Sequence, residues 1–426
     1  MMNRSPGSLG LVLLILLVIA QLGALTLHTV AEEQSILWRY AAQGKIVDIQ
    51  ISYDAKHIFV LDDSGYVYFL DKDGNEITIK RFTDIAFDDL FNPVFKLADK
   101  KIILLVAETV ENGQVYYAYS GDGKRLWSML IPGYTLSYDI SHGGNYVAIA
   151  YRPLEVDSAN PYFVLELYNN GEKTASLNIQ LSSIIYYTGI RVTVTDNGIV
   201  AVFRPDIRKV ELYDSSGTFI KSYAVNGEGS LAMLSIDDEG TRLGYCLVSG
   251  LQCTLTEITI ADGGSWSARL KISSIPVVAS SSDLSLIALK NDDINVTFID
   301  TIEKTYRTEI VKDASRIVVD YKGDNIVVSG DKTIYIFKKG VDEAYETTIY
   351  GSITSLAISG DGRLILAGDD WGRVYAIMNP AEEKTSQIVS IIVGGIVIVL
   401  GTMAIVIVMR KKEKPEPEEE EEIYPA

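Results

Sequence analysis

The sequence predicts an all-β protein in which small four-stranded sheets close into a ring, followed by one C-terminal transmembrane helix. The first observation is an internal repeat, because residues 46–68 align without gaps on residues 353–375 with 10 identities in 23 positions. The offset of 307 residues is seven steps of about 44, the period of a four-stranded propeller blade. The second observation is that weaker units of the same strand and turn order fill the interval. Together they predict an eight-bladed β-propeller, with seven blades as the alternative.

The eight units share the order of apolar strand, polar turn, apolar strand, loop and apolar strand. Their first strands are expected to begin near Ile46, Phe91, Leu136, Ile190, Leu231, Val277, Ile317 and Ile353. Asp, Asn and Gly recur in the turns because they tolerate positive φ or bond their own backbone. We interpret them as turn residues, since the DKDG at 71–74 lacks the ligand spacing of an EF-hand.

The eighth unit lacks a fourth strand, because Pro380 and a polar linker follow its third strand at Asn379. Residues 35–40 supply the missing strand, since Leu37-Trp38 repeats the Leu126-Trp127 pair of the second unit. Pairing the first strand with the last removes open sheet edges. We expect each Trp to pack between neighbouring sheets. Ser35 and Asn379 should then be neighbours on one face of the ring.

Two apolar segments bracket the propeller, which we assign to residues 35–379 as one domain. Residues 9–27 carry no charge and precede a small-residue pattern that ends at Ala31. We interpret residues 1–31 as a signal peptide cleaved after Ala31, with an uncleaved anchor as the alternative.

Residues 388–409 are 22 uncharged residues, enough to span a bilayer as a helix. Arg410, Lys411, Lys412 and Lys414 follow, so the positive-inside rule places the C-terminus in the cytoplasm and the propeller outside. This predicts a single-pass, type I-like protein of the cell membrane. Residues 380–387 form a linker, and residues 410–426 form a basic and then acidic cytoplasmic tail.

The membrane segment also carries a stripe of mostly small residues at spacings of four and three. Small residues promote helix packing in bilayers, so homo-association through this helix is an open possibility. The stripe consists of Ser390, Gly394, Val397, Gly401 and Ala404.

The chain has a formal net charge of −18, which disfavours phosphate-rich partners. We therefore expect no nucleic-acid binding. The only cysteines are Cys246 and Cys253. If Ser249 and Gly250 centre a hairpin turn, the two cysteines face each other directly, within reach of a disulfide. An extracytoplasmic site permits that oxidation, and two buried thiols are the alternative.

Catalytic patterns are scarce in this sequence. Beyond the leader the only histidines are His57 and His142, and the chain has no HExxH, GxSxG, P-loop or CxxCH motif. Paired carboxylates such as Asp62-Asp63 and Asp369-Asp370 are adjacent in sequence and therefore point apart. We expect no enzyme activity, no catalytic or metal site and no cofactor.

Units of the form strand, (S/T)xDG, strand, GxVYxLDxDG, strand, LW resemble the PQQ-like and WD40/YVTN-like β-propeller superfamily over roughly residues 35–379. Its members include quinoprotein dehydrogenases and envelope scaffold proteins. The dehydrogenases that this fold resembles use adjacent cysteines beside a quinone, whereas here the cysteines are seven residues apart. The resemblance therefore implies a non-catalytic surface protein.

The loops between second and third strands should lie on the face away from the membrane, where function concentrates. Tyr151, Arg152, Arg204 and Trp371 lie in these segments and combine the residue types enriched at protein contacts. We therefore expect a surface scaffold that binds an envelope protein, peptide or glycan. The alternative is an extracytoplasmic propeller enzyme, quinoprotein-like or a hydrolase or lyase, with a site spread over several blades.

Overall fold

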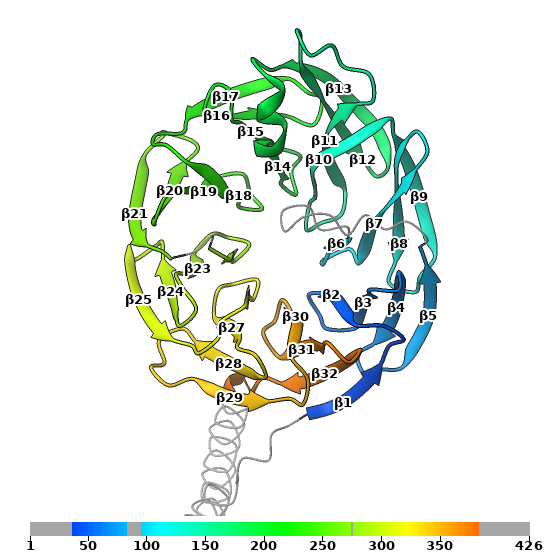
Figure 1. Cartoon of the computed structure of the whole chain (residues 1–426), viewed down its shortest axis with the longest axis vertical. Helices are drawn as coiled ribbons and strands as arrows, with labels where there is room; N and C mark the ends of the chain where they lie inside the picture. Colours follow the sequence, from blue (N-terminus) through cyan, green and yellow to red (C-terminus); the bar gives the residue numbers. More distant parts are fainter. Residues whose placement is uncertain (1–35, 83–94, 274–275, 383–426) are drawn as a thin grey trace, which may run out of the picture.

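The protein is an eight-bladed β-propeller in a computed structural model that describes residues 36–82, 95–273 and 276–382. Eight antiparallel four-stranded sheets stand around a central axis (Figure 1). The prediction of eight blades is confirmed, and the seven-bladed alternative is wrong.

Each blade runs from an inner strand near the axis to an outer strand at the rim. Blades 1 to 4 contain β2 (Ile46–Ile51), β3 (His57–Asp62), β4 (Tyr66–Asp71), β5 (Glu76–Arg81), β6 (Phe95–Ala98), β7 (Ile103–Val110), β8 (Gly113–Ser120), β9 (Arg125–Ile131), β10 (Gly133–Ile140), β11 (Tyr146–Pro153), β12 (Tyr162–Asn169), β13 (Glu172–Gln180), β14 (Arg191–Val194), β15 (Val200–Arg204), β16 (Lys209–Tyr213) and β17 (Phe219–Ala224). A 3-10 helix, η1 (Ile184–Gly189), joins blades 3 and 4.

The remaining blades follow the same order, and the last one takes its outer strand from the N-terminus. Blades 5 to 8 contain β18 (Ser230–Ile236), β19 (Arg242–Ser249), β20 (Gln252–Thr259), β21 (Ser265–Lys271), β22 (Val278–Ser280), β23 (Leu286–Lys290), β24 (Asn295–Asp300), β25 (Thr305–Ile310), β26 (Arg316–Val319), β27 (Asn325–Ser329), β28 (Thr333–Lys338), β29 (Tyr345–Thr348), β30 (Ile353–Ile358), β31 (Leu364–Asp369), β32 (Arg373–Met378) and β1 (Ile36–Ala41).

The predicted strand starts lie within three residues of the observed ones in seven blades. The eighth prediction, Phe91, falls outside the described residues, and β6 begins at Phe95. These strand starts could be predicted because the first strand of a blade is a short apolar run followed by a turn, and both signals are local.

The ring closes as expected, because β1 pairs with β32 and Ile36 lies opposite Ile377. Ser35 itself lies outside the described residues. The start of β1 and the end of β32 therefore share one face of the ring. On that face Asn379 is fully buried and donates to the Gly362 carbonyl at 2.7 Å, while Glu382 accepts from Lys338 at 2.9 Å. The chain is thus held against blades 7 and 8 beyond its last strand.

The two tryptophans of the Leu-Trp pairs pack between neighbouring blades, as predicted. Trp38 lies over Gly74 of blade 1 and donates from Nε1 to the Lys72 carbonyl at 2.9 Å. Trp127 of blade 2 lies over Gly171 of blade 3 in the same way. Both glycines have a positive φ, +80° and +82°, and a Cβ added at either would meet the indole ring at 2.6 Å. Each Trp therefore requires a glycine, which has no Cβ, in the facing turn of the next blade.

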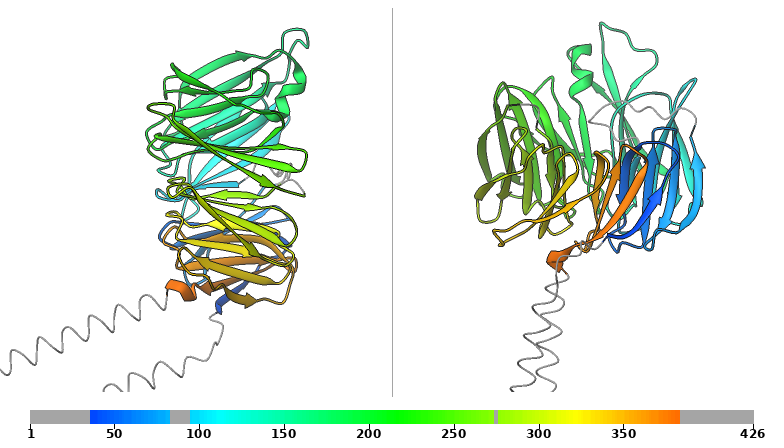
Figure 2. Two further views of the ribbon diagram at one scale, coloured as in Figure 1. Left: turned by 90° about the vertical axis from the view of Figure 1, so that its left-hand side faces the viewer. Right: turned by 60° about the horizontal axis from the view of Figure 1, so that its bottom comes forward.

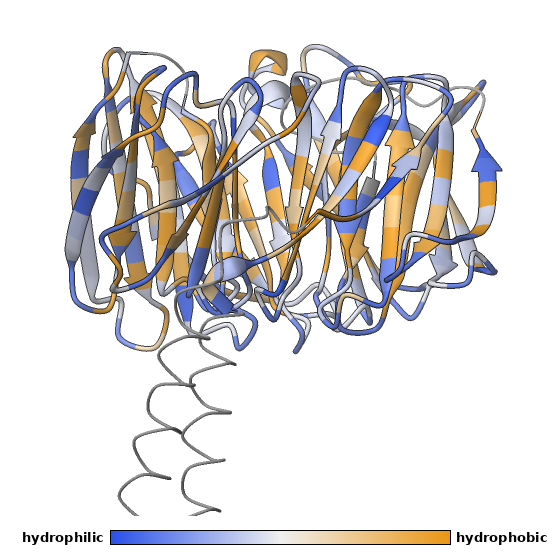
Figure 3. Ribbon diagram, turned by 90° about the horizontal axis from the view of Figure 1, so that it is seen from below, coloured by the Kyte–Doolittle hydropathy of each residue, from blue (hydrophilic) through white to orange (hydrophobic). Residues whose placement is uncertain are grey.

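The core is divided among the blade interfaces. Among the described residues, eight clusters of buried apolar side chains each join two successive blades, including one between blades 8 and 1. In Figure 3 the apolar colour follows the strands, and the hydrophilic colour gathers at the turns. Burial between twisted sheets is the main stabilising contribution, and ring closure completes it.

The two faces of the ring carry different connections. We name the "turn face" the one with the turns between first and second strands and the chain segment 379–382, and the "loop face" the opposite one with the loops between second and third strands. Figure 2 shows η1 and the β11–β12 loop on the side away from 379–382. Over the described residues we find no helix with the length and apolar composition to cross a bilayer. The predicted segment 388–409 lies outside those ranges.

The cysteine pair is joined by a disulfide with a Cα–Cα distance of 6.5 Å, but the predicted register is wrong. Cys246 lies opposite Leu255, and Cys253 lies opposite Val248. Ser249 lies opposite Gln252, so the hairpin turn is centred on Gly250 and Leu251. Gly250 has φ +58°, which suits the first central position of a type II′ turn. The cysteines therefore form a diagonal pair on one face of the hairpin.

Candidate functional site

The four predicted contact residues fall on two opposite sides of the ring. Tyr151 and Arg152 belong to β11 of blade 3, and Arg204 ends β15 of blade 4. Trp371 lies in the β31–β32 loop of blade 8, across the axis from blade 4 (Figure 1). All four occupy the loop-face ends of their blades, but they do not form one surface.

Arg152 lies against two aromatic rings on the loop face. Its Cζ is 5.0 Å from the ring centre of Tyr134 and 5.9 Å from that of Tyr187 in η1. Tyr187 is buried and donates to the Tyr162 carbonyl at 2.8 Å, whereas Tyr134 keeps 52% of its surface exposed. Among the described residues the guanidinium group is thus held in place by rings rather than by a carboxylate.

Exposed aliphatic side chains occur in the β11–β12 loop, in η1 and in the β15–β16 loop of the same two blades. Together with Tyr134 and Arg152 they form what we call the "blade 3–4 surface", to which η1 contributes two isoleucines. Ile185 is 70% exposed, more than the others. The aliphatic members are Leu154, Ile184, Ile185 and Ile207.

Tyr151 and Arg204 are engaged in hydrogen bonds within blades 3 and 4. Tyr151 is only 4% exposed, and its hydroxyl donates to buried Glu166 at 3.3 Å. Nη2 of Arg204 donates to Asp206 at 2.9 Å and to the Gln180 carbonyl at 2.7 Å. Their hydrogen-bonding groups are engaged within the fold, so Arg152 is the member of the three that presents its charge to solvent.

The turn face carries a polar network that the sequence reasoning missed. In seven blades the second residue after the first strand lies at this end of the axis, and in blade 2 the first residue after β6 takes that place. We call this set the "belt". It consists of Tyr53, Asp99, His142, Asp196, Asp238, Ser282, Tyr321 and Gly360.

Hydrogen bonds link the belt from blade to blade. Backbone N–H groups donate across blade boundaries from Tyr53 to Asp99, from Asp196 to Asp238 and from Ser282 to Tyr321. Lys100, next to the belt, donates from Nζ to Asp238 at 2.8 Å and to Asp196 at 3.1 Å. Its ammonium group also lies 4.8 Å from the centre of the Tyr321 ring. The belt therefore holds the inner turns of distant blades together.

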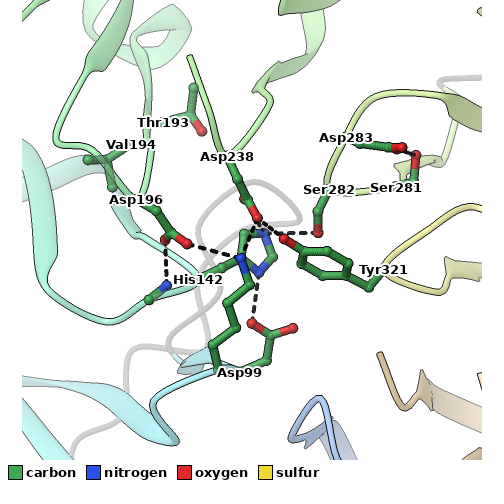
Figure 4. A network of polar contacts seen from close by, with 12 residues as sticks. Asp99, His142, Thr193, Val194, Asp196, Asp238, Ser281, Ser282, Asp283 and Tyr321 are labelled. Atoms are coloured by element: carbon green, nitrogen blue, oxygen red, sulfur yellow. Dashed lines mark hydrogen bonds and ion pairs between the residues drawn. The ribbon is translucent and has the colours of Figure 1, made fainter. Parts of the chain in front are cut away.

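His142 lies within this network (Figure 4), between a carboxylate and a hydroxyl. Its Nδ1 is 2.9 Å from Asp99 Oδ1, and its Nε2 is 3.3 Å from Ser282 Oγ and 3.7 Å from Asp238 Oδ1. Burial lowers the pKa of His142, but the hydrogen bond to Asp99 and the charges of Asp99 and Asp238 outweigh it. The pKa of His142 therefore lies above its ordinary value.

A cavity of about 270 Å³ lies on the axis beside the belt, with residues from all eight blades around it. Lys96 forms an ion pair with Asp139, whose Oδ2 also accepts from Thr193 Oγ1 at 2.8 Å and from the Val194 N–H at 2.9 Å. The charged groups on this wall are mutually paired. Among the described residues no cluster of three or more His, Cys, Asp or Glu side chains has metal-ligand geometry.

No family model and no curated protein matches the chain. Solved propellers do match in structure. BamB from Moraxella catarrhalis is 14% identical with a TM-score of 0.53, covering 81% of this chain and 100% of that one. The Dos1 propeller is 13% identical with a TM-score of 0.57 over 82% of this chain and 96% of that one.

The C-terminal WD40 domain of Sif2 is 14% identical with a TM-score of 0.60, covering 82% of this chain and 98% of that one. Identities this low show a shared fold and nothing about shared ligands. Together with the closed ring of eight blades, these likenesses show the β-propeller fold.

Proposed function

We propose that this protein is a membrane-anchored scaffold whose propeller lies outside the cytoplasmic membrane and binds another envelope protein through the blade 3–4 surface. The placement rests on the sequence, with an uncharged segment at 388–409 and basic residues behind it. The binding role rests on the composition and exposure of one patch of the loop face.

The blade 3–4 surface carries this proposal. Protein contact centres are enriched in aromatic residues and arginine, and their anchors are surrounded by apolar contacts that exclude water. Arg152 against Tyr134 and Tyr187, together with exposed Ile185 in η1 and exposed Leu154 in the next loop, has that composition. Exposed apolar surface that is rimmed by polar residues is typical of protein interaction sites.

The proposed attachment to the membrane is on the turn face of the propeller. The segment 379–382 is bound to blades 7 and 8, so a chain that continues into a membrane helix leaves from the turn face. Residues 383–387 remain before the helix, and five extended residues reach about 18 Å. Under this proposal the loop face is turned away from the bilayer and toward partners.

The test compares partners recovered with the full-length chain from its own membranes. Ile185→Asp and Arg152→Glu should each remove a stoichiometric partner that the wild-type protein retains. Ile310→Asp is the matched control, because Ile310 is 79% exposed on the outer strand of blade 6. Retention of the partner by Ile185→Asp would exclude the blade 3–4 surface.

A second candidate function is hydrolysis, because Ser282, His142 and Asp99 have the contacts of a nucleophile, a base and its orienting carboxylate. In that reading His142 removes the Ser282 proton and Asp99 fixes the imidazole. The competing contact from Nε2 to Asp238 at 3.7 Å and the role of the belt in joining blades favour the scaffold.

A fluorophosphonate probe separates the two functions, since it labels only an activated serine. Labelling of Ser282 that disappears in His142→Gln would establish the hydrolase. A chain that stays unlabelled while its partner is still recovered would leave the scaffold alone.

A further inference from the structure

Aromatic rings and guanidinium groups alternate in a row of five side chains at blade 8, whose middle ring, Tyr375, is fully buried. Arg39 Cζ lies 5.5 Å from the ring centres of both Tyr350 and Tyr375. Arg373 Cζ lies 5.9 Å from the Tyr375 ring and 4.2 Å from Trp371. We call Tyr350, Arg39, Tyr375, Arg373 and Trp371 the "blade 8 stack". Its two ends are open, because Tyr350 is 63% and Trp371 64% exposed.

One cation of this stack, Arg39, has donors to spare. Arg39 is exposed, and within the described part of the chain it has neither a hydrogen-bond acceptor nor an ion-pair partner. Arg373 donates from Nε to buried Asp369 at 3.0 Å, and its Nη2 is buried without an acceptor among the described residues, so Arg39 is the cation that offers donors to solvent. A guanidinium held by ring faces keeps its in-plane N–H groups free to receive a planar anion.

Blade 1 shows that the fold does not require these residues. The repeat offset of 307 makes Asp62 and Tyr68 the equivalents of Asp369 and Tyr375, and both blades keep that pair hydrogen-bonded. The residues around the pair differ, although the strand registers are the same. Blade 1 has Gln43, Ser64, Tyr66 and Ile79 where blade 8 has Tyr350, Trp371, Arg373 and Arg39.

Compared with blade 1, blade 8 has two additional cations and exposed aromatic surface around the Asp369–Tyr375 pair. The equivalent pair in blade 1 forms without them. They stand on the loop face, across the ring from the blade 3–4 surface (Figure 1). A need other than packing therefore accounts for these residues. Their chemistry indicates a ligand with a planar anionic group for the guanidinium and a flat face for the aromatic ring.

We propose that the blade 8 stack binds an acidic sugar chain, with a hexuronate carboxylate on Arg39 and a sugar ring on the free face of Trp371. A carboxylate matches the paired N–H groups of a guanidinium edge. An indole that is nearly two-thirds exposed offers a flat face rather than a pocket, whereas the anchor side chain of a peptide requires a desolvated pocket. The open stack therefore favours a sugar over an acidic peptide.

The overall charge shapes this binding. The chain carries a net charge of −18, so a polyanion is repelled by the rest of the surface and is attracted only at the stack. The attraction involves exposed charges, and salt above the physiological range screens it. We expect affinity for short oligomers that falls as salt is raised.

The experiment measures binding of tetragalacturonic acid to the full-length chain in detergent by calorimetry. Arg39→Ile and Trp371→Ser place the blade 1 residues in blade 8, so both variants should fold, and unchanged thermal unfolding checks this. Each should weaken binding at least about tenfold, because each removes one of the two groups that hold the sugar. Arg307→Gln should change it less than about twofold, since Arg307 lies over Phe298 at 5.6 Å but is paired with Glu309.

Two further ligands identify the source of the carboxylate. The methyl ester of the same oligomer should not bind, because it has no anion for Arg39. Hexaglutamate should bind much more weakly than the oligomer, and equal binding would overturn the assignment to a sugar. Absence of galacturonate binding, or equal binding by Arg39→Ile, would also overturn the proposal. Partner recovery through the blade 3–4 surface is independent of all these outcomes.

Discussion

The hydroxyl of Tyr68 donates a hydrogen bond of 2.8 Å to the buried carboxylate of Asp62. Tyr375 and Asp369, each 307 residues later, repeat the contact at 3.1 Å. In both blades the carboxylate also accepts two N–H bonds from the following loop, at 3.0 and 2.9 Å for Asp62 and at 2.9 and 2.8 Å for Asp369. The internal repeat therefore preserves a hydrogen-bonded frame for the loop between second and third strands.

Removing this frame should destabilise the ring. Asp62→Ala leaves several donors without an acceptor and should lower the free energy of unfolding by about 3 kcal/mol or more. Tyr68→Phe removes one bond to a charged group and should cost about 2 kcal/mol. Urea unfolding followed by tryptophan fluorescence measures both. Asp73→Ala is the control, since Asp73 is exposed and pairs with exposed Lys72. Equal losses in all three variants would contradict this account.

The Trp38 contact can be separated from backbone strain with two glycines. Gly74 and Gly263 have similar φ values, +80° and +76°, but a Cβ at Gly74 meets Trp38, whereas a Cβ at Gly263 meets nothing within 4 Å. Gly263→Ala should cost about 1 kcal/mol from strain alone. Gly74→Ala should cost at least about 1 kcal/mol more, because the indole must move. Identical urea unfolding midpoints for Gly74→Ala and Gly263→Ala would show that Trp38 does not require glycine at position 74.

The sequence allowed prediction of blade number, ring closure and most strand starts, because these depend on local alternation and on one strong repeat. The hairpin at Cys246 was misplaced by register, since a glycine such as Gly250 can take either central position of a two-residue turn. The turn type is decided by strand twist and by packing of the hairpin, which no short pattern records.

The functional surfaces were harder to predict for a different reason. His142 and Asp99 lie in turns where Asp, Ser and Gly are expected for turn chemistry, so their residue types carry no separate signal. Alignment of the eight turns, with the shorter turn of blade 2 shifted by one residue, would have identified the belt. Arg39 becomes part of a stack only through ring closure, which brings an N-terminal residue beside Tyr375.

His142 should make stability depend on pH. The raised pKa means that the folded state holds the proton more tightly than the unfolded chain, whose histidine pKa is about 6.5. The stabilisation is therefore complete below about pH 6.5 and is lost as the pH rises through the higher folded pKa. Unfolding free energies of wild-type and His142→Gln protein should differ most below about pH 6.5 and converge as the pH rises through the folded pKa of His142. A gap that widens with rising pH would contradict the sign.

The charged groups facing His142 provide the control for that experiment. Asp99→Asn removes the hydrogen-bonded carboxylate, so the NMR titration of His142 should move to a lower pKa. Asp238, Lys100, Tyr321 and Ser282 remain around it in this variant. An unchanged titration would assign the raised pKa to other groups.

The disulfide should be intact in the mature protein and modest in its effect. Non-reducing mass spectrometry should recover one peptide pair joined through Cys246 and Cys253. Reduction should lower the free energy of unfolding by about 2 kcal/mol or less, because the bond closes a short loop that the hairpin already holds. Thiols that alkylate without reductant in the denatured chain would refute the pairing.

The central claim is that the loop face of a membrane-anchored propeller meets a protein partner, and photocrosslinking in intact cells tests it most directly. A photoreactive residue would be placed at Ile185 on the loop face, at Ile310 on the rim or at Arg363 on the turn face, all of them exposed. The account predicts one discrete protein adduct from position 185, lost when Arg152→Glu is added, and none from position 310. Adducts of equal yield from all three positions, or an adduct at 185 that survives Arg152→Glu, would contradict it.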